Sequence, residues 1–116
     1  MTETQIQQSC VKWFRIQYPK WARLLISIPN EGIRSRGAAM RMKAEGMVPG
    51  AADLILFHPT ASRPALFLEC KTVTGRQSAN QKQFEQAVTD AGYRYELFRS
   101  LDEFRGVVEG FVEQPF

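Results

Sequence analysis

The sequence predicts an α/β fold in which a mixed β-sheet is flanked by helices. Its 116 residues are 44% hydrophobic, which is enough for one core but leaves little room for a second. Two apolar runs, 51–57 and 65–71, flank a segment with two prolines and predict an antiparallel hairpin, because proline cannot sit inside a central strand. A helical pattern between the second run and a later strand pattern predicts a right-handed parallel βαβ crossover. We therefore expect a single domain over residues 1–116.

Capping signals and chain breakers delimit the individual elements. Thr2-x-x-Gln5 and Ser78-x-x-Gln81 are capping-box patterns that begin helices, and Ser35 is a further N-cap. Proline and glycine mark the ends of several elements, because neither continues a helix well. The predicted elements, in order, are helix 3–18, strand 24–28, helix 36–45, strands 51–57 and 65–71, a helix from 78 to about 91, strand 93–99 and a closing helix capped by Ser100.

The predicted hairpin places two acids opposite each other. If Phe57 faces Ala65, antiparallel pairing keeps the sum of facing residue numbers constant, which puts Asp53 opposite Glu69. Like charges that face each other in a sheet are destabilising, so this pair needs a compensating cation or a raised pKa. A divalent metal ion would meet that need.

Lys71 follows Glu69 by two positions on the second strand of the hairpin. Because side chains alternate along a strand, Lys71 points to the same side as Glu69 and Cys70 to the other. Metal, water and phosphate could then meet around the three charged groups. An acid and a lysine two residues apart are also typical of a solvated edge strand, and the pattern alone does not separate these interpretations.

The positive charge of the chain is concentrated in its amino-terminal part. Residues 1–47 carry eight Lys/Arg and three acids, a balance of +5, whereas the remaining seven Lys/Arg and nine acids give −2. Such an excess suits a polyanionic partner, although surface cations often serve only solubility, so charge alone does not decide. The candidate nucleic-acid-binding residues are Arg34, Arg36, Arg41, Lys43 and Arg76.

Other site classes find little support. No run of about 18 apolar residues is present, and the first residues lack the basic and apolar regions of a signal peptide. We therefore expect a soluble protein without a membrane segment, located in the cytoplasm. Cys10 and Cys70, with a single histidine at His58, do not have zinc-ligand spacing, and we expect both cysteines in the core.

The elements follow the order helix, strand, hairpin, helix and strand, with one acid on the first arm of the hairpin and acid-x-Lys on the second. This order resembles that of the PD-(D/E)xK nucleases, which share a restriction-endonuclease-like fold. Within that superfamily the chain resembles the VRR-NUC group, the virus-type replication-repair nucleases. One departure is Ala52, where the family usually has proline before the acid, with Pro49 three residues earlier; proline there would only stiffen the start of the strand. The matching segments are 28–32, 43–46, 49–56 and 69–71, followed by Gly75, Ser78, Gln81, Gly92 and Tyr93.

The resemblance implies a metal-dependent active site. Asp53 and Glu69 would bind Mg²⁺ or Mn²⁺ together with the backbone carbonyl of Cys70, because these ions prefer oxygen ligands. Lys71 would orient or deprotonate the attacking water, or stabilise the charge that develops on the phosphate.

The resemblance also implies roles for residues on two helices. Glu3 matches an acid on the first helix of the family, where it would hold a second metal or a water bound to the metal. Gln81 matches a glutamine expected beside Lys71, although from its spacing it could equally be a capping residue that bonds only to its own backbone. Asn30 and Tyr93 are weaker matches that could equally be structural.

These expectations describe an endonuclease that hydrolyses DNA phosphodiester bonds with Mg²⁺ or Mn²⁺, selective for branched or four-way junction DNA. The family resemblance favours a homodimer. The alternative is a non-catalytic nucleic-acid-binding module that retains the nuclease fold. RNA also stays open as a substrate, because the chemistry at phosphorus does not require the sugar's 2′-hydroxyl to be recognised.

Overall fold

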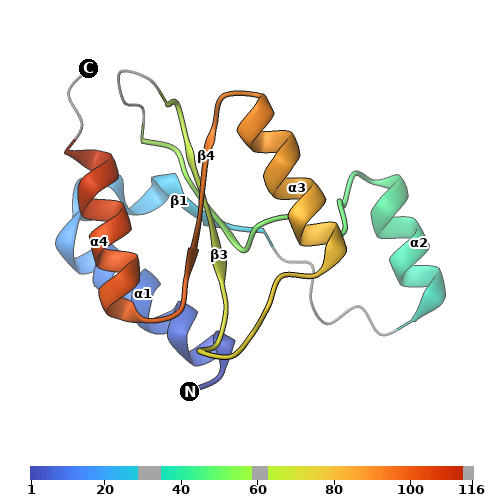
Figure 1. Ribbon diagram of the computed structural model, residues 1–116, viewed down its shortest axis with the longest axis horizontal. Helices are drawn as coiled ribbons and strands as arrows, with labels where there is room; N and C mark the ends of the chain where they lie inside the picture. The colour runs from blue at the N-terminus through green and yellow to red at the C-terminus, as the bar shows by residue number, and fades with distance from the viewer. Residues whose placement is uncertain (29–34, 59–62, 114–116) are drawn as a thin grey trace.

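A four-stranded mixed sheet with the order β1-β2-β3-β4 organises the molecule (Figure 1). The structure is a computed structural model that describes residues 1–28, 35–58 and 63–113. β1 (Leu25–Ser27) and β2 (Leu54–Leu56) pair antiparallel, as do β2 and β3 (Leu66–Cys70). β4 (Arg94–Phe98) runs parallel to β3, which confirms the predicted βαβ unit.

The hairpin has the predicted register. Leu54 faces Leu68 and Leu56 faces Leu66, so the facing residue numbers have the same constant sum as Phe57 with Ala65. The alternation in β2 and β3 buries all four of these leucines, since each is 1% exposed or less. A slip of one residue would turn these side chains to the other face of the sheet, so their burial fixes the register.

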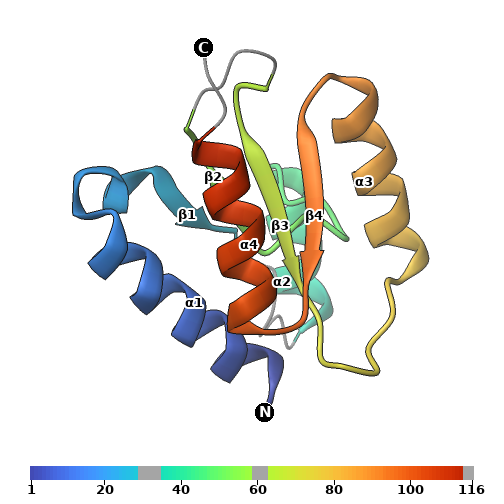
Figure 2. The same cartoon turned by 60° about the vertical axis from the view of Figure 1, so that its left-hand side comes forward.

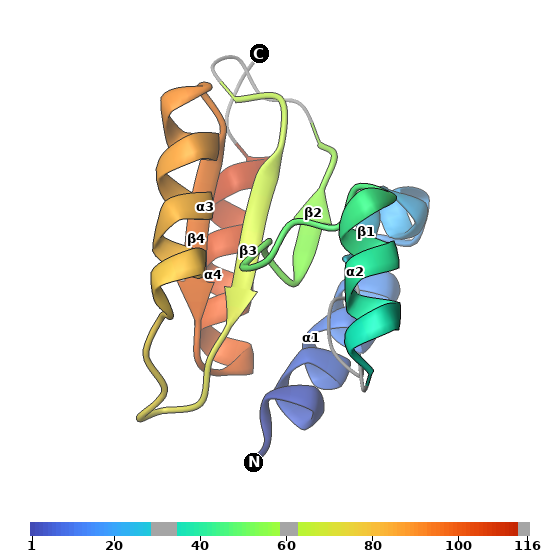
Figure 3. The same ribbon diagram turned by 90° about the vertical axis from the view of Figure 1, so that its right-hand side faces the viewer.

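Helices cover both faces of the sheet. α1 (Glu3–Gln17) and α4 (Leu101–Val112) lie on one face, as Figure 2 shows. α3 (Ala79–Asp90) covers the other face, and α2 (Arg36–Ala44) stands further out on the same side (Figure 3). The main core lies between the sheet and the pair α1 and α4. Its largest fully buried side chains are Phe14, Phe98, Phe104 and Phe111.

The element boundaries differ from the prediction mainly around the first strand. Residues Pro19–Leu24 form a 3₁₀-helix, η1, which the sequence did not indicate, and β1 begins only at Leu25. Aromatic packing accounts for this turn, because the rings of Tyr18 and Trp21 stack with centroids 5.4 Å apart and both pack against the core. The predicted turn at residues 30–32 lies outside the described residues.

Gly50 sets the approach to β2. Its φ of +84° lies in the left-handed region, and a Cβ at this position would come within 2.4 Å of the carbonyl carbon of Asn80. Only glycine allows the backbone before β2 to lie so close to the start of α3. This contact brings the segment that carries Asp53 close to the segment that carries Gln81. β2 itself covers only Leu54–Leu56 of the predicted 51–57.

Both cysteines are core residues, as predicted. Cys10 and Cys70 are fully buried and unpaired by a disulfide, and burial raises the pKa of each thiol to about 12. Within the described ranges, no helix has the length and apolar character that crossing a membrane requires.

Candidate active site

Asp53 and Glu69 meet where the hairpin opens. Asp53 lies just before β2, and its Oδ2 accepts a hydrogen bond of 2.7 Å from the backbone N–H of Cys70. Glu69 is in β3 and is only 1% exposed. Burial, followed by the hydrogen bond and negative charge of Asp53, raises the pKa of Glu69 to about 9. Without a cation, a carboxyl pair this close therefore retains a proton at neutral pH.

Lys71 lies on the same side as Glu69. Its side chain is mostly buried, with 8% of the residue exposed, and its positive charge lowers the pKa of Glu69 against the larger opposing effects. Its backbone N–H donates to the carbonyl of Phe98 in β4 at 3.0 Å. The chain then turns at Gly75, where a Cβ would lie 3.5 Å from Cδ of Lys71. The lysine is thus enclosed by its own loop.

Gln81 has both of the roles that its spacing left open. Its Oε1 accepts from the backbone N–H of Ser78 at 2.8 Å, which completes the capping box of α3. Its Nε2 donates to Oε2 of Glu69 at 3.2 Å. One side chain therefore fixes the start of the helix and orients a carboxylate in the sheet.

Two further residues near Glu69, Tyr95 and Gln77, were not predicted from the sequence. The hydroxyl of Tyr95 in β4 donates to Oε1 of Glu69 at 3.4 Å, and it accepts from Nε2 of Gln77 at 3.3 Å. Gln77 also donates to Glu85 of α3 at 2.9 Å. Tyr95 shares a face with Glu69 only because β4 pairs with β3 in a particular register, and no local pattern in the sequence reveals that register.

Arg99 is a third residue that the sequence did not single out. Its Nη1 donates to the carbonyls of Thr72 and Gly75, each at 2.6 Å, and lies 3.5 Å from that of Val73. The guanidinium therefore holds the loop that follows Lys71. Nη1 carries two N–H donors, one for each of the two 2.6 Å contacts.

Glu3 lies at the margin of the acidic pair. Its backbone carbonyl accepts a long hydrogen bond from the Cys70 thiol at 3.5 Å, and with Asp53 it lines a cavity of about 690 Å³. Among the described residues, no group of three or more His, Cys, Asp or Glu is placed to hold a metal ion. Asp53 and Glu69 thus form a two-carboxylate site, and a role for Glu3 at a metal stays a prediction.

The sequence as a whole was compared with known proteins. A sequence model described as the VRR-NUC domain matches residues 1–102. The chain belongs to the VRR-NUC family. A solved structure described as a VRR_NUC domain protein superimposes with a TM-score of 0.86 at 19% identity, covering 99% of this chain and 91% of that one. The search of curated proteins gave no significant match.

The donor set of this VRR-NUC domain fits a hard divalent cation. Mg²⁺ is usually bound through one or two carboxylates and keeps several waters. Asp53 and Glu69 supply two carboxylates, and the raised pKa of Glu69 reflects a need for positive charge that an ion would satisfy. Gln81 and Tyr95 each donate a hydrogen bond to Glu69, as outer partners commonly do for metal-binding carboxylates.

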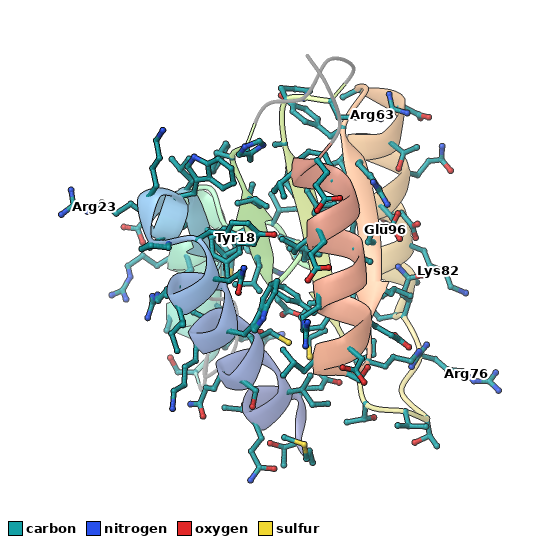
Figure 4. The ribbon with its side chains drawn as sticks, turned by 90° about the vertical axis from the view of Figure 1, so that its left-hand side faces the viewer. Tyr18, Arg23, Arg63, Arg76, Lys82 and Glu96 are labelled. Atoms are coloured by element: carbon teal, nitrogen blue, oxygen red, sulfur yellow. The ribbon has the colours of Figure 1, made fainter. Side chains whose placement is uncertain are left out.

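The predicted nucleic-acid-binding residues are not gathered at one place. Arg36, Arg41 and Lys43 are exposed on α2, and Arg41 pairs with Glu45 at 3.7 Å. Arg76 extends from the loop before α3 (Figure 4). Arg34 lies outside the described residues. Two cations that the prediction omitted, Lys12 and Arg15 of α1, line the cavity that contains Asp53.

Proposed function

We propose that this VRR-NUC domain is an endonuclease that hydrolyses DNA phosphodiester bonds with Mg²⁺ or Mn²⁺ and prefers branched DNA. The observation that carries the proposal is the buried pair of Asp53 and Glu69 with Lys71 on the same side. Family membership supports a nuclease, because the matched region includes all three residues. The geometry supports hydrolysis because it gathers oxygen ligands and one cation at one point.

Asp53 and Glu69 would hold the ion, which when bound would supply positive charge against the phosphate oxygens. Gln81 and Tyr95 keep the Glu69 carboxylate in one orientation through their hydrogen bonds. The backbone N–H of Cys70 does the same for Asp53. The chain therefore arranges its ligands before any substrate arrives, which reduces the cost of reorganisation during the reaction.

Lys71 supplies the remaining function at the reacting phosphate. Its ammonium group can donate a hydrogen bond to the attacking water or to a non-bridging phosphate oxygen. The enclosing loop and its clamp by Arg99 restrict where that group can go. Charge stabilisation by Lys71 grows as negative charge develops in the transition state, so it accelerates the chemical step rather than only substrate binding.

Selectivity for branched DNA and a homodimeric state are further parts of the proposal. Their support is the resemblance to stand-alone family members similar to junction-resolving enzymes, in which two sites face a four-way junction. With DNA as the substrate, we also place the protein in the cytoplasm. Light scattering tests the assembly directly, and a monomeric mass at the protein concentration used for cleavage would contradict the homodimer.

Cleavage assays test the activity. Labelled four-way junction, flapped and linear DNA are incubated with Mg²⁺, Mn²⁺ or a chelator, and we expect products only with metal, most from branched DNA. Asp53→Ala and Lys71→Ala should each abolish the products. Asp90→Ala and Lys82→Ala are matched controls, because both residues are exposed on α3 and their removal should leave the rate unchanged. Cleavage that persists in both site variants would overturn the proposal.

Calorimetry distinguishes the enzyme from a module that only binds nucleic acid. Titration with Mn²⁺ should release or absorb heat in the wild type and none in Glu69→Gln. The glutamine variant has nearly the same shape and keeps one acceptor oxygen, for either the Tyr95 hydroxyl or the Gln81 amide, while it removes the charge. Absence of heat in both proteins, together with retained DNA binding, would indicate the non-catalytic module.

A further inference from the structure

A groove runs from Asp53, one member of the acidic pair, along the first helix. It has a volume of about 690 Å³ and lies between α1, β1 and the start of β2; we call it the α1 groove. Glu3 and Asp53 line it near the start of α1, and Lys12 and Arg15 line it near the end of the same helix. At a rise of about 1.5 Å per residue, Glu3 and Arg15 are about 18 Å apart along the helix axis.

The sequence of α1 gives the groove its shape. Glu3, Gln7, Val11 and Arg15 recur at intervals of four residues, so they share one face of the helix, and Lys12 is adjacent. All five residues line the groove. Apolar side chains also line it, namely Val11, Ile16, Leu25, Ile28 and Leu54. The groove thus combines apolar walls with acids at one end and cations at the other.

The cations are available for a ligand. Lys12 and Arg15 are exposed, and neither takes part in any of the ion pairs found between described residues. Among the described residues, the acids that line the groove are Glu3 and Asp53, at the opposite end from Arg15. A polyanion that leaves the catalytic acids would therefore meet two positive charges in succession along one helix face.

We propose that the α1 groove binds the unpaired DNA strand on one side of the cleaved bond, with Lys12 and Arg15 contacting its phosphates. This inference rests on the proposed nuclease function. The volume lies within the ~300–1,000 Å³ typical of pockets for a single small ligand, so the groove admits a short single strand. Duplex DNA is too wide, since its major groove alone measures about 12 Å across.

The position of the cations sets the length of strand involved. Successive phosphates of one strand are at least about 3.4 Å apart along its axis, so the ~18 Å from Glu3 to Arg15 spans no more than about five nucleotides. The apolar walls suit the faces of unstacked bases, and neither feature selects a base sequence. Recognition in the groove therefore depends on strand structure rather than on sequence.

A binding assay tests the groove independently of cleavage. Fluorescence anisotropy of a labelled single strand of about 12 nucleotides is measured in chelator. We expect Lys12→Gln/Arg15→Gln to bind at least about tenfold more weakly, with a salt dependence that is smaller by about 1.4, because each phosphate contact on a single strand contributes about 0.7 to the slope. Circular dichroism confirms that each variant is folded.

The matched control removes the same charge elsewhere. Lys82 and Arg105 are exposed on α3 and α4, and Figure 4 shows Lys82 pointing away on the side of the sheet opposite α1. Lys82→Gln/Arg105→Gln should bind the single strand within twofold of the wild type. An equal loss in this control, or an equal loss of duplex and single-strand binding in the groove variant, would overturn the inference.

A kinetic assay separates this inference from the proposed function. On a duplex with a single-stranded tail, the groove variant should raise KM about tenfold and leave kcat within twofold. Unchanged binding and KM in this variant, with a wild type that cleaves, would refute the groove alone. Conversely, a wild type that cleaves no DNA with either metal, beside a groove variant that loses single-strand binding, would refute the nuclease and retain the groove.

Discussion

Gln81 bonds both to the start of α3 and to the Glu69 carboxyl group, so its effects on helix stability and on Glu69 orientation can be separated by mutation. Gln81→Ala removes both of its hydrogen bonds, to the N–H of Ser78 and to Glu69. Ser78→Ala is the matched variant, because it removes the hydroxyl that caps Gln81 N–H at 3.2 Å and leaves the bond to Glu69. A comparison of the two variants therefore isolates the effect of the hydrogen bond from Gln81 to Glu69.

The magnitudes follow from the number of bonds lost. A helix cap contributes about 1 kcal/mol, and a neutral side-chain hydrogen bond contributes about as much. We therefore expect the free energy of unfolding to fall by about 1 kcal/mol in Ser78→Ala and about 2 kcal/mol in Gln81→Ala. For a chain of this size, 1 kcal/mol lowers Tm by about 4 °C, so the expected losses are about 4 and 8 °C.

Ser78→Ala and Gln81→Ala should differ more in their Mn²⁺ requirement than in their stability. Removing an outer partner of a metal ligand typically weakens metal affinity or activity about 10–100-fold. The Mn²⁺ concentration for half-maximal cleavage should therefore rise by this factor in Gln81→Ala and stay unchanged in Ser78→Ala. Thermal melts in chelator and Mn²⁺ titrations measure the two effects. Equal Mn²⁺ requirements in the two variants would show that Gln81 acts only as a cap.

Two further predictions concern charge and loop order. Because the pKa of Glu69 is raised to about 9, folded protein in chelator keeps a proton that the unfolded chain releases near pH 4.5, so stability should fall as pH rises from about 5 to about 9. Asp53→Asn should make that fall shallower, because it removes a charge that helps to raise the pKa of Glu69, and it should abolish cleavage. An equally steep fall in this variant would contradict the assignment. Arg99→Ala should lower kcat about tenfold, as loss of a positioning contact commonly does. It should also speed amide hydrogen exchange in the loop after Lys71. Unchanged exchange would show that Arg99 does not hold this loop.

Local patterns predicted most of the fold. Capping boxes at Thr2 and Ser78 and N-caps at Ser35 and Ser100 all appear in the structure, because each depends on atoms within a few residues. The hairpin register also matches the prediction, because alternating burial along the two strands allows few pairings. The 3₁₀-helix η1 was not predicted, because it depends on packing among aromatic rings.

In the candidate site, too, the residues placed by local patterns were predicted and those placed by tertiary packing were not. The hairpin register predicted that Asp53 lies opposite Glu69, and a capping pattern on the following helix drew attention to Gln81. Tyr95 of β4 and Arg99, the residue after β4, were not predicted, because β4 pairs with β3 only after the chain has passed through α3. The nucleic-acid-binding residues predicted on α2 reflected local charge density, which does not show which helix borders the acids.

The sequence by itself determined the order of elements, the register of the hairpin and the placing of two acids and a lysine at one end of it. These depend on backbone hydrogen bonds and on the alternation of side chains, both of which are local. Only the tertiary structure decided that Glu69 is buried to 1% exposure, that Arg99 holds the loop after Lys71, and that α1 borders the acids with Lys12 and Arg15. Those features depend on how helices and strands distant in the chain pack to bury apolar surface, which sets the electrostatics of the site.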